Sequence, residues 1–122
     1  MKTEEVSEKF NINIEELRYY ESVGLLDDVK INDGIREYED KDIKILSKVI
    51  TLKNLELNIS EISRYIKLMN LGLDGDNERI KILNKKRNIL LDEIHDKQKN
   101  IDCLDYIIYE IKKNQLREKK QL

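Results

Sequence analysis

The stretch IEELRYYESVGLLDDVKINDGIREY, residues 14–38, contains the features that decide the fold. Its first half predicts a helix over residues 14–23 that stops at Gly24. Its second half contains two short alternating stretches around Asp33-Gly34, which is the commonest sequence signal for a tight β-hairpin. A small hairpin that directly follows a helix in this way predicts a wing.

The residues immediately upstream predict another short helix and a tight turn. Residues 3–10 have apolar side chains at helical spacing, and Asn11 tolerates the left-handed backbone that a tight turn between helices needs. Asn13 is placed to cap the next helix, and Glu16 stands where it would complete a capping box. The two helices predict a helix-turn-helix, although many helical hairpins share this pattern.

Two further amphipathic helices are expected after the hairpin. Asp40 is the expected cap of the third helix, and Asn58 is the expected cap of the fourth, with Glu61 at the capping-box position. The outer face of the third helix carries three lysines at helical spacing: Lys41, Lys44 and Lys48.

From Asn77 onward the apolar pattern repeats every seven residues, and eight of the ten seam positions are apolar. These eight are Ile80, Leu83, Leu90, Ile94, Ile101, Leu104, Ile108 and Ile111. Such a pattern predicts a coiled coil whose partner is a second copy of the chain. A hairpin that folds back near Asn100 is less favoured, because no turn residues cluster there. We place the domain boundary in the break at residues 70–76, between a head, 1–74, and a dimerisation helix with a basic tail, 75–122.

The composition supports a mostly helical chain, because its 122 residues include no proline and 39% of them are charged. Residues 1–74 contain 11 Lys and Arg against 16 Asp and Glu, whereas residues 75–122 contain 12 against 9. The acidic head is unexpected for a nucleic-acid binder. One cysteine excludes an intramolecular disulfide framework, and no segment has the pattern of a secretion signal or a membrane span. We expect a soluble, cytoplasmic protein.

The stretch over residues 17–26 resembles the LRYYExxGLL signature of the MerR family of transcription regulators. Residues 34–38 match the GxRxY pattern of that family's wing, and residues 38–43 and 57–62 resemble the starts of its third and fourth helices. The resemblance covers residues 3–69 nearly continuously. It implies a mostly α fold in which a winged helix-turn-helix head precedes a long antiparallel coiled-coil helix. It also implies a homodimer that binds and distorts a pseudo-palindromic site in double-stranded DNA, with RNA polymerase as a further partner at the promoter.

The resemblance implies DNA contacts by Arg18 and Tyr19 in the second helix and by Arg36 in the wing. Tyr38 matches a position at the base of the wing that packs or touches phosphate. Arg18 could instead pair with a neighbouring glutamate on its own helix, but the wing arginine at the family's spacing favours DNA contact. The complete set of candidates for DNA contact is Asn13, Arg18, Tyr19, Lys30, Arg36, Tyr38, Lys41, Lys44 and Lys48.

The chain also departs from the family pattern. Glu15 and Glu16 occupy the start of the recognition helix, where carboxylates disfavour phosphate, although glutamate can accept a hydrogen bond from cytosine. Glu56 and Asn11 stand where the family usually has glycine. These departures leave the operator sequence and the affinity open.

The remaining polar residues do not suggest a cofactor or an active site. Cys103 and His95 are the only cysteine and histidine, so a metal centre of the kind that metal-sensing relatives use is not expected. A lone histidine also cannot build a catalytic triad, and no glycine-rich phosphate loop occurs. We expect a protein that has no cofactor and is not an enzyme.

Two other functions remain open from the sequence. The acidic head could belong to a winged-helix module that binds a protein, such as an adaptor or antirepressor, and dimerises through its coiled coil. The chain could also be a purely structural coiled-coil dimer, although a scaffold needs no wing. DNA binding requires that the basic residues share one face while the acids point away. The effector, the regulated genes and the direction of regulation are not readable from the sequence.

Overall fold

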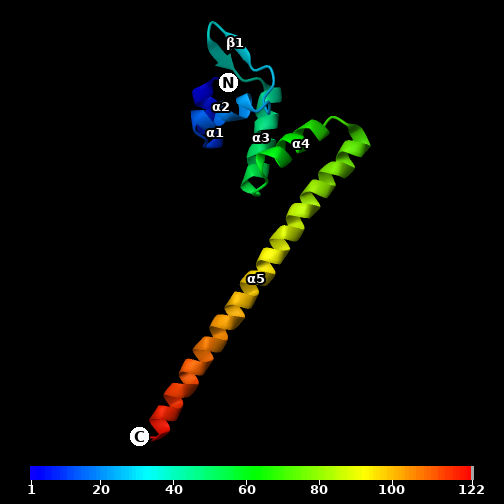
Figure 1. Ribbon diagram of the computed structural model, residues 1–122. Coiled ribbons are helices and arrows are strands. Elements are labelled where there is room, and N and C mark those ends of the chain that lie inside the picture. The colour runs from blue at the N-terminus through cyan, green and yellow to red at the C-terminus, as the bar shows by residue number, and fades with distance from the viewer. Residues whose placement is uncertain (122) are drawn as a thin grey trace. The chain divides into compact units, whose positions relative to one another are not determined.

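The computed structural model describes residues 1–121 and contains five helices and one two-stranded sheet within them (Figure 1). The elements are α1 (Thr3–Phe10), α2 (Ile14–Ser22), β1 (Lys30–Asn32), β2 (Ile35–Glu37), α3 (Asp40–Asn54), α4 (Ile59–Leu68) and α5 (Gly72–Gln121). The chain divides into two compact units, one from Met1 to Ile82 and the other from Leu83 onward.

The turn between α1 and α2 forms as the asparagines predict. Asn11 adopts the left-handed conformation at φ 51° and ψ 48°. The side-chain oxygen of Asn13 accepts a hydrogen bond from the backbone N–H of Glu16 at 2.7 Å, so this cap is confirmed. The expected capping box also has a second half, in which the Glu16 carboxylate would accept from the backbone N–H of Asn13. Instead, this carboxylate accepts from the Tyr20 hydroxyl and pairs with Lys53. Glu16 therefore joins α2 to α3 instead of closing its own helix.

The predicted wing is confirmed as an antiparallel hairpin. Strands β1 and β2 pair with Ile31 opposite Arg36. Asp33 and Gly34 between them both have positive φ, at 50° and 76°. This is the backbone of the tight turn that follows the right-handed twist of paired strands. Directly after β2, the backbone N–H of Tyr38 donates to the carbonyl of Met1 at 2.7 Å, which ties the base of the wing to the start of the chain.

The helices α3 and α4 begin at caps of different kinds. Asn58 and Glu61 form the complete capping box expected for α4, with hydrogen bonds of 2.8 and 3.1 Å. The expectation that Asp40 caps α3 is wrong, because Glu39 holds that position. The reason is the buried Asp42, whose carboxylate reaches back three residues and accepts from the Glu39 backbone N–H at 2.9 Å.

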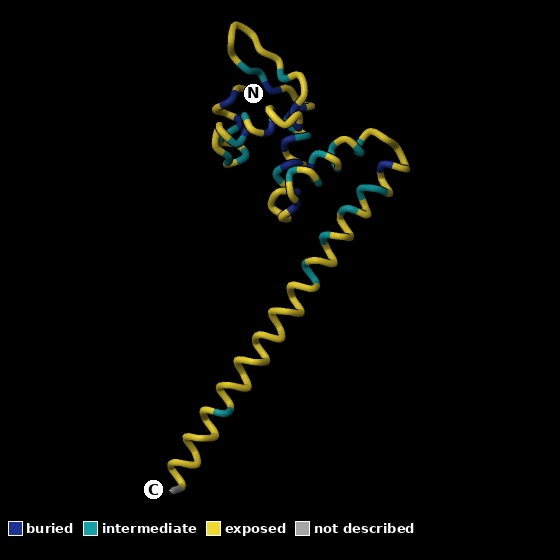
Figure 2. The backbone as a smooth tube through the Cα atoms, viewed as in Figure 1, coloured by how far each residue is buried: buried dark blue, intermediate teal, exposed yellow. Residues whose placement is uncertain are grey.

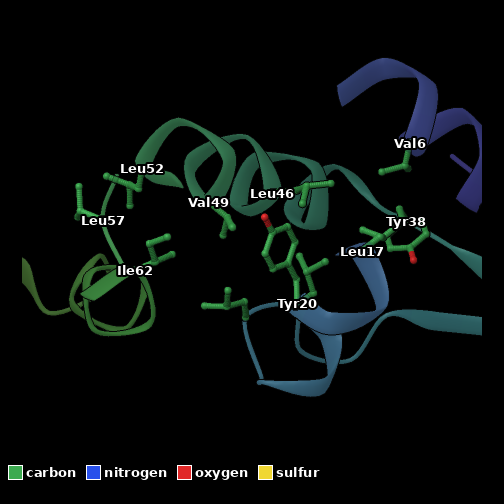
Figure 3. Packing of buried hydrophobic residues seen from close by; sticks show 11 residues of the cluster. Val6, Leu17, Tyr20, Tyr38, Leu46, Val49, Leu52, Leu57 and Ile62 are labelled. Carbon is green, nitrogen blue, oxygen red and sulfur yellow. The ribbon is translucent and has the colours of Figure 1, made fainter. Parts of the chain in front are cut away.

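The hydrophobic core lies within the first unit and is built mainly from α2, α3 and the segments that follow them. Leu17, Leu46 and Val49 are fully buried. In Figure 3, Tyr20 of α2 extends toward Leu46 and Val49 of α3, so the core joins these two helices. Figure 2 shows that the buried backbone segments lie in the part of the chain before residue 83. Burial of side chains of this size stabilises a fold by roughly 1.5–3 kcal/mol each.

The long helix α5 begins at Gly72 and not at Asn77, where the heptad pattern had placed it. The two glycines in the expected break at residues 70–76 have different roles. Gly72 has a φ of +63°, a conformation that permits the sharp turn after α4. A Cβ on Gly75 would lie 2.2 Å from the carbonyl oxygen of Leu68, so this glycine lets α5 approach the end of α4 closely. At 1.5 Å per residue, the 50 residues of α5 extend about 75 Å.

Candidate nucleic-acid interface

The two arginines predicted to contact DNA share a single carboxylate. Arg18 comes from α2 and Arg36 comes from β2, and both pair with Glu21 near the end of α2. The hydroxyl of Tyr38 lies in the same group and donates to Glu21 at 2.6 Å. We call Arg18, Glu21, Arg36 and Tyr38 the arginine cluster. It joins the second helix of the helix-turn-helix to the wing.

Arg18 is held by three partners and remains partly accessible. Its Nη1 donates to the Tyr38 hydroxyl at 3.0 Å, and its Nη2 donates to the Thr3 hydroxyl at 3.4 Å. Nη1 also lies 3.5 Å from the Glu21 carboxylate, which is the same-helix ion pair considered as the alternative to DNA contact. The Arg18 side chain is 35% exposed, so these contacts fix its direction without covering it.

Arg36 uses only one of its donor groups in the cluster. Its Nε donates to Glu21 at 3.0 Å, and the side chain is 31% exposed. Guanidinium groups carry five N–H donors in a planar fork. A contact through Nε therefore leaves the two terminal amino groups of Arg36 for a further acceptor, such as a phosphate.

Tyr38 belongs to the hydrophobic core, which is the packing role that the resemblance implied for it; a contact of this residue with phosphate stays a prediction. The residue is only 2% exposed, and it belongs to the same buried cluster as Val6 and Leu17. Burial raises the pKa of Tyr38, and the hydrogen bond and negative charge of Glu21 raise it further, while Arg18 opposes the shift. The phenol thus remains neutral near physiological pH and keeps its proton for Glu21.

Three other candidates for DNA contact are exposed but have different surroundings. Tyr19 is 47% exposed, whereas its neighbour Tyr20 is buried in the core. Lys30 is exposed on β1, opposite Glu37. Asn13 is exposed, but its side-chain oxygen is already used as the cap of α2.

The three lysines of α3 are exposed, but they do not line one surface feature. Lys44 and Lys48 border a largely apolar hollow of about 440 Å³ beside Phe10 and Met69. Lys41 borders a different hollow of about 280 Å³, which three aspartates, Asp27, Asp28 and Asp42, also line. No recorded ion pair or hydrogen bond of the described chain links these lysines to the arginine cluster.

Sequence reasoning missed the central role of Glu21. Its spacing of three residues from Arg18 on one helix did signal a possible ion pair. Its contact with Arg36, fifteen residues away, depends on how the wing folds back, and no local pattern reports that. Thr3, the partner of Arg18 at the start of α1, was missed for the same reason.

The second candidate interface is the apolar seam of α5. Most described seam side chains of this helix beyond residue 83 are exposed: Ile94, Ile101 and Leu104 are 61%, 50% and 59% exposed. A shallow hollow of about 510 Å³ runs along it, bordered by Leu90, Ile94 and Ile101 and by the longer polar side chains between them. An apolar surface of this length requires a partner.

Residues 1–121 contain no group of three or more His, Cys, Asp or Glu side chains that could hold a metal ion. Cys103 is exposed and has a free thiol. No helix in the described part of the chain is both long and apolar enough to span a membrane.

Comparisons with known proteins agree with this architecture. Residues 1–68 match the family model described as MerR HTH family regulatory protein. The HTH-type transcriptional regulator AdhR of Bacillus subtilis is 35% identical over 94 residues, which is 76% of this chain but only 62% of AdhR. An HTH-type transcriptional regulator of Haemophilus influenzae is 30% identical over 105 residues, 85% of this chain and 78% of the relative. A solved structure, HiNmlR, "a MerR family regulator lacking the sensor domain, bound to promoter DNA", superposes with a TM-score of 0.68 at 29% identity and covers 87% of this chain and 81% of HiNmlR.

Proposed function

Because this chain belongs to the MerR family of helix-turn-helix regulatory proteins, we propose that it is a DNA-binding transcription regulator that acts on promoter DNA as a homodimer. It works by binding and not by catalysis, and it acts in the cytoplasm, where promoter DNA is. The chain spans less than two thirds of AdhR, and no effector domain is required for this proposal.

The observation that carries the proposal is the arginine cluster. The helix-turn-helix and the wing each supply one guanidinium group, from Arg18 and Arg36, and a shared carboxylate holds both at one place. Guanidinium groups bind phosphate through paired N–H donors, and such contacts set the register of a protein on the duplex. HiNmlR, which has this fold, is bound to promoter DNA in its solved structure.

The apolar seam of α5, the second candidate interface, supports the homodimer in this proposal. In the arrangement we propose, residues 80–111 of two chains pair antiparallel, with Ile80 of one protomer level with Ile111 of the other. Arg87 and Lys97, the two charged seam positions, then lie near acidic side chains of the other protomer and fix the register at some cost in stability. Two heads at fixed separation require a pseudo-palindromic operator with half-sites about one or two helical turns apart.

We further propose that the dimer bends its operator and acts together with RNA polymerase at the promoter. Bending a site of this length costs of order 1–6 kcal/mol by elastic estimates, which phosphate contacts of both heads must supply. A circular-permutation mobility assay tests the bend. Two results together would refute rigid coupling of the two heads. One is a complex whose gel mobility is the same wherever the site lies in the fragment, and the other is unchanged affinity after a five-base-pair insertion at the dyad.

The direct experiment is a mobility-shift assay on the DNA upstream of the protein's own gene, at two salt concentrations. Arg18→Ala and Arg36→Ala should each weaken binding and reduce the salt slope by about one unit, as expected for the loss of one phosphate contact. Arg64→Ala is the matched control, because Arg64 lies on α4 and pairs with Glu78, away from the cluster. Equal effects of all three substitutions would contradict the proposed interface.

A protein-binding module is the second candidate, and the net negative charge of the head favours it. The same assay separates the two functions. If the intact dimer binds neither its upstream DNA nor any other duplex at low salt, the DNA-binding proposal fails and the adaptor function replaces it.

A further inference from the structure

We propose that Glu21 is a specificity-determining residue: it positions Arg18 and Arg36 for an operator and, by its charge, weakens their attraction to unrelated DNA. This inference rests on the proposed function, since it assumes that the arginine cluster faces DNA. It assigns a role to a residue that does not itself need to touch the duplex. Glu21 acts through its neighbours, so it is a positioning residue. Its carboxylate also competes with the phosphate for the guanidinium groups of Arg18 and Arg36.

The two oxygens of Glu21 are used separately. Oε1 accepts from the Tyr38 hydroxyl at 2.6 Å and lies 3.5 Å from Nη1 of Arg18. Oε2 accepts from Nε of Arg36 at 3.0 Å. One carboxylate thus connects the recognition helix, the wing and the buried tyrosine at the base of the wing. Rotation of its side chain would break contacts with all three neighbours.

The carboxylate is also the least exposed charged group of the cluster. The Glu21 side chain is 14% exposed, compared with 35% for Arg18 and 31% for Arg36. Pairs that are partly shielded from water are screened by salt much less than fully exposed pairs. Glu21 consequently cancels one of the two positive charges at salt concentrations at which surface ion pairs contribute little.

This cancellation affects the two modes of DNA binding unequally. Binding to unrelated DNA depends on charge and on the release of counterions. Binding to an operator depends in addition on groups held in a fixed register. Arg36 meets Glu21 through Nε alone, so a correctly placed phosphate can be bound by its terminal amino groups without displacing the carboxylate. Glu21 therefore reduces unrelated binding while it preserves, and orients, operator binding.

The test compares two duplexes of equal length, one with the DNA upstream of the gene and one with the same bases in scrambled order. Glu21→Gln keeps the size of the side chain and one acceptor oxygen but removes the charge. We expect it to bind the scrambled duplex about tenfold more tightly near 0.1 M salt, with a salt slope about one unit steeper. Upstream binding should gain less than this or weaken, so the ratio of the two affinities falls.

Two further variants separate charge from position and protect the test against misfolding. Glu21→Asp keeps the charge but withdraws the carboxylate, so scrambled binding should stay low while upstream binding weakens. Glu8→Gln on the exposed face of α1 removes the same charge away from the cluster, and it should leave the affinity ratio near that of the wild type. Thermal unfolding of each variant verifies that the head is folded.

The outcomes distinguish this inference from the proposed function. If the wild type does not prefer the upstream duplex, the proposed function itself fails. If the wild type does prefer it, and Glu21→Gln changes the affinity ratio no more than Glu8→Gln does, only the role of Glu21 is overturned. If Glu21→Gln does not fold, unaltered upstream binding by Glu21→Asp also overturns that role.

Discussion

Replacing Ile94 and Ile101 together with Asp should convert the dimer to monomers. Both residues occupy position a of the α5 heptads, and in the single chain they are 61% and 50% exposed. Full burial of an isoleucine contributes roughly 1.5–3 kcal/mol, so covering half of each contributes about 1 kcal/mol. A dimer holds four such side chains, and their loss costs about 4 kcal/mol, or about a thousandfold in Kd. The cost of burying carboxylates adds to this value.

The single substitutions should also reveal the orientation of the two chains. If Ile80 lies level with Ile111 in an antiparallel pair, position 94 lies level with Lys97 of the other protomer and position 101 lies level with Leu90. A new carboxylate at 94 then finds a lysine, whereas one at 101 finds only leucine. Ile101→Asp should therefore weaken the dimer more than Ile94→Asp. In a parallel pair each new carboxylate would meet its own copy, and the two effects would be similar.

Sedimentation equilibrium over a range of protein concentrations measures both effects as dissociation constants. The matched control is Asn88→Asp combined with Tyr106→Asp, which adds two carboxylates outside the seam, at positions b and f. This control should remain dimeric. Intact dimers of the Ile94→Asp, Ile101→Asp variant at the wild-type Kd would refute the seam, and equal effects of the two single substitutions would refute the antiparallel register.

The remaining predictions concern the head and the free thiol. Leu46→Ala should lower the free energy of unfolding by about 2–5 kcal/mol in a denaturant titration, because Leu46 is fully buried, whereas the exposed Leu71→Ala should have little effect. The free energy of unfolding should fall above about pH 10, because the pKa of Tyr38 is raised in the folded state and its phenol ionises less readily there than in the unfolded chain. Tyr38→Phe should lessen this alkaline loss of stability. An unchanged loss would contradict the raised pKa of Tyr38 as its cause. Cys103→Ser should leave DNA binding and dimerisation unchanged with or without reductant. A large effect of the substitution or of reductant on DNA binding in the mobility-shift assay would instead indicate a redox role for this exposed thiol.

The elements that could be predicted from sequence are those that short-range chemistry determines. Asn11, Asn58 and the Asp33-Gly34 pair each act within a few residues, through a left-handed backbone or a side chain that caps its own helix. Such signals are contained in local sequence, and the structure confirms them. The resemblance to a family supplied the arrangement of these elements, which periodicity alone would have left open.

The errors arose where distant parts of the chain determine a residue's role. The heptad pattern placed the start of the long helix at Asn77, but α5 begins at Gly72 and contains Gly75, where the carbonyl oxygen of Leu68 leaves no room for a Cβ. Tyr38 was given two roles, packing at the base of the wing or contact with phosphate, and its burial shows the packing. In both cases the residue type was compatible with two roles, and only tertiary packing selects between them.

The acidic composition of the head is less of an obstacle to DNA binding than the net charge suggests, because several acids have internal partners. Glu21 pairs with both arginines of the cluster, and Glu16 pairs with Lys53. Asp42 and Glu61 accept backbone N–H groups at the starts of α3 and α4, where the positive end of each helix compensates a negative charge. What a phosphate meets is the local field at the exposed guanidinium groups and not the sum over the head. On this reasoning the acids restrict attraction to DNA to a small surface, where geometry in addition to charge selects the site.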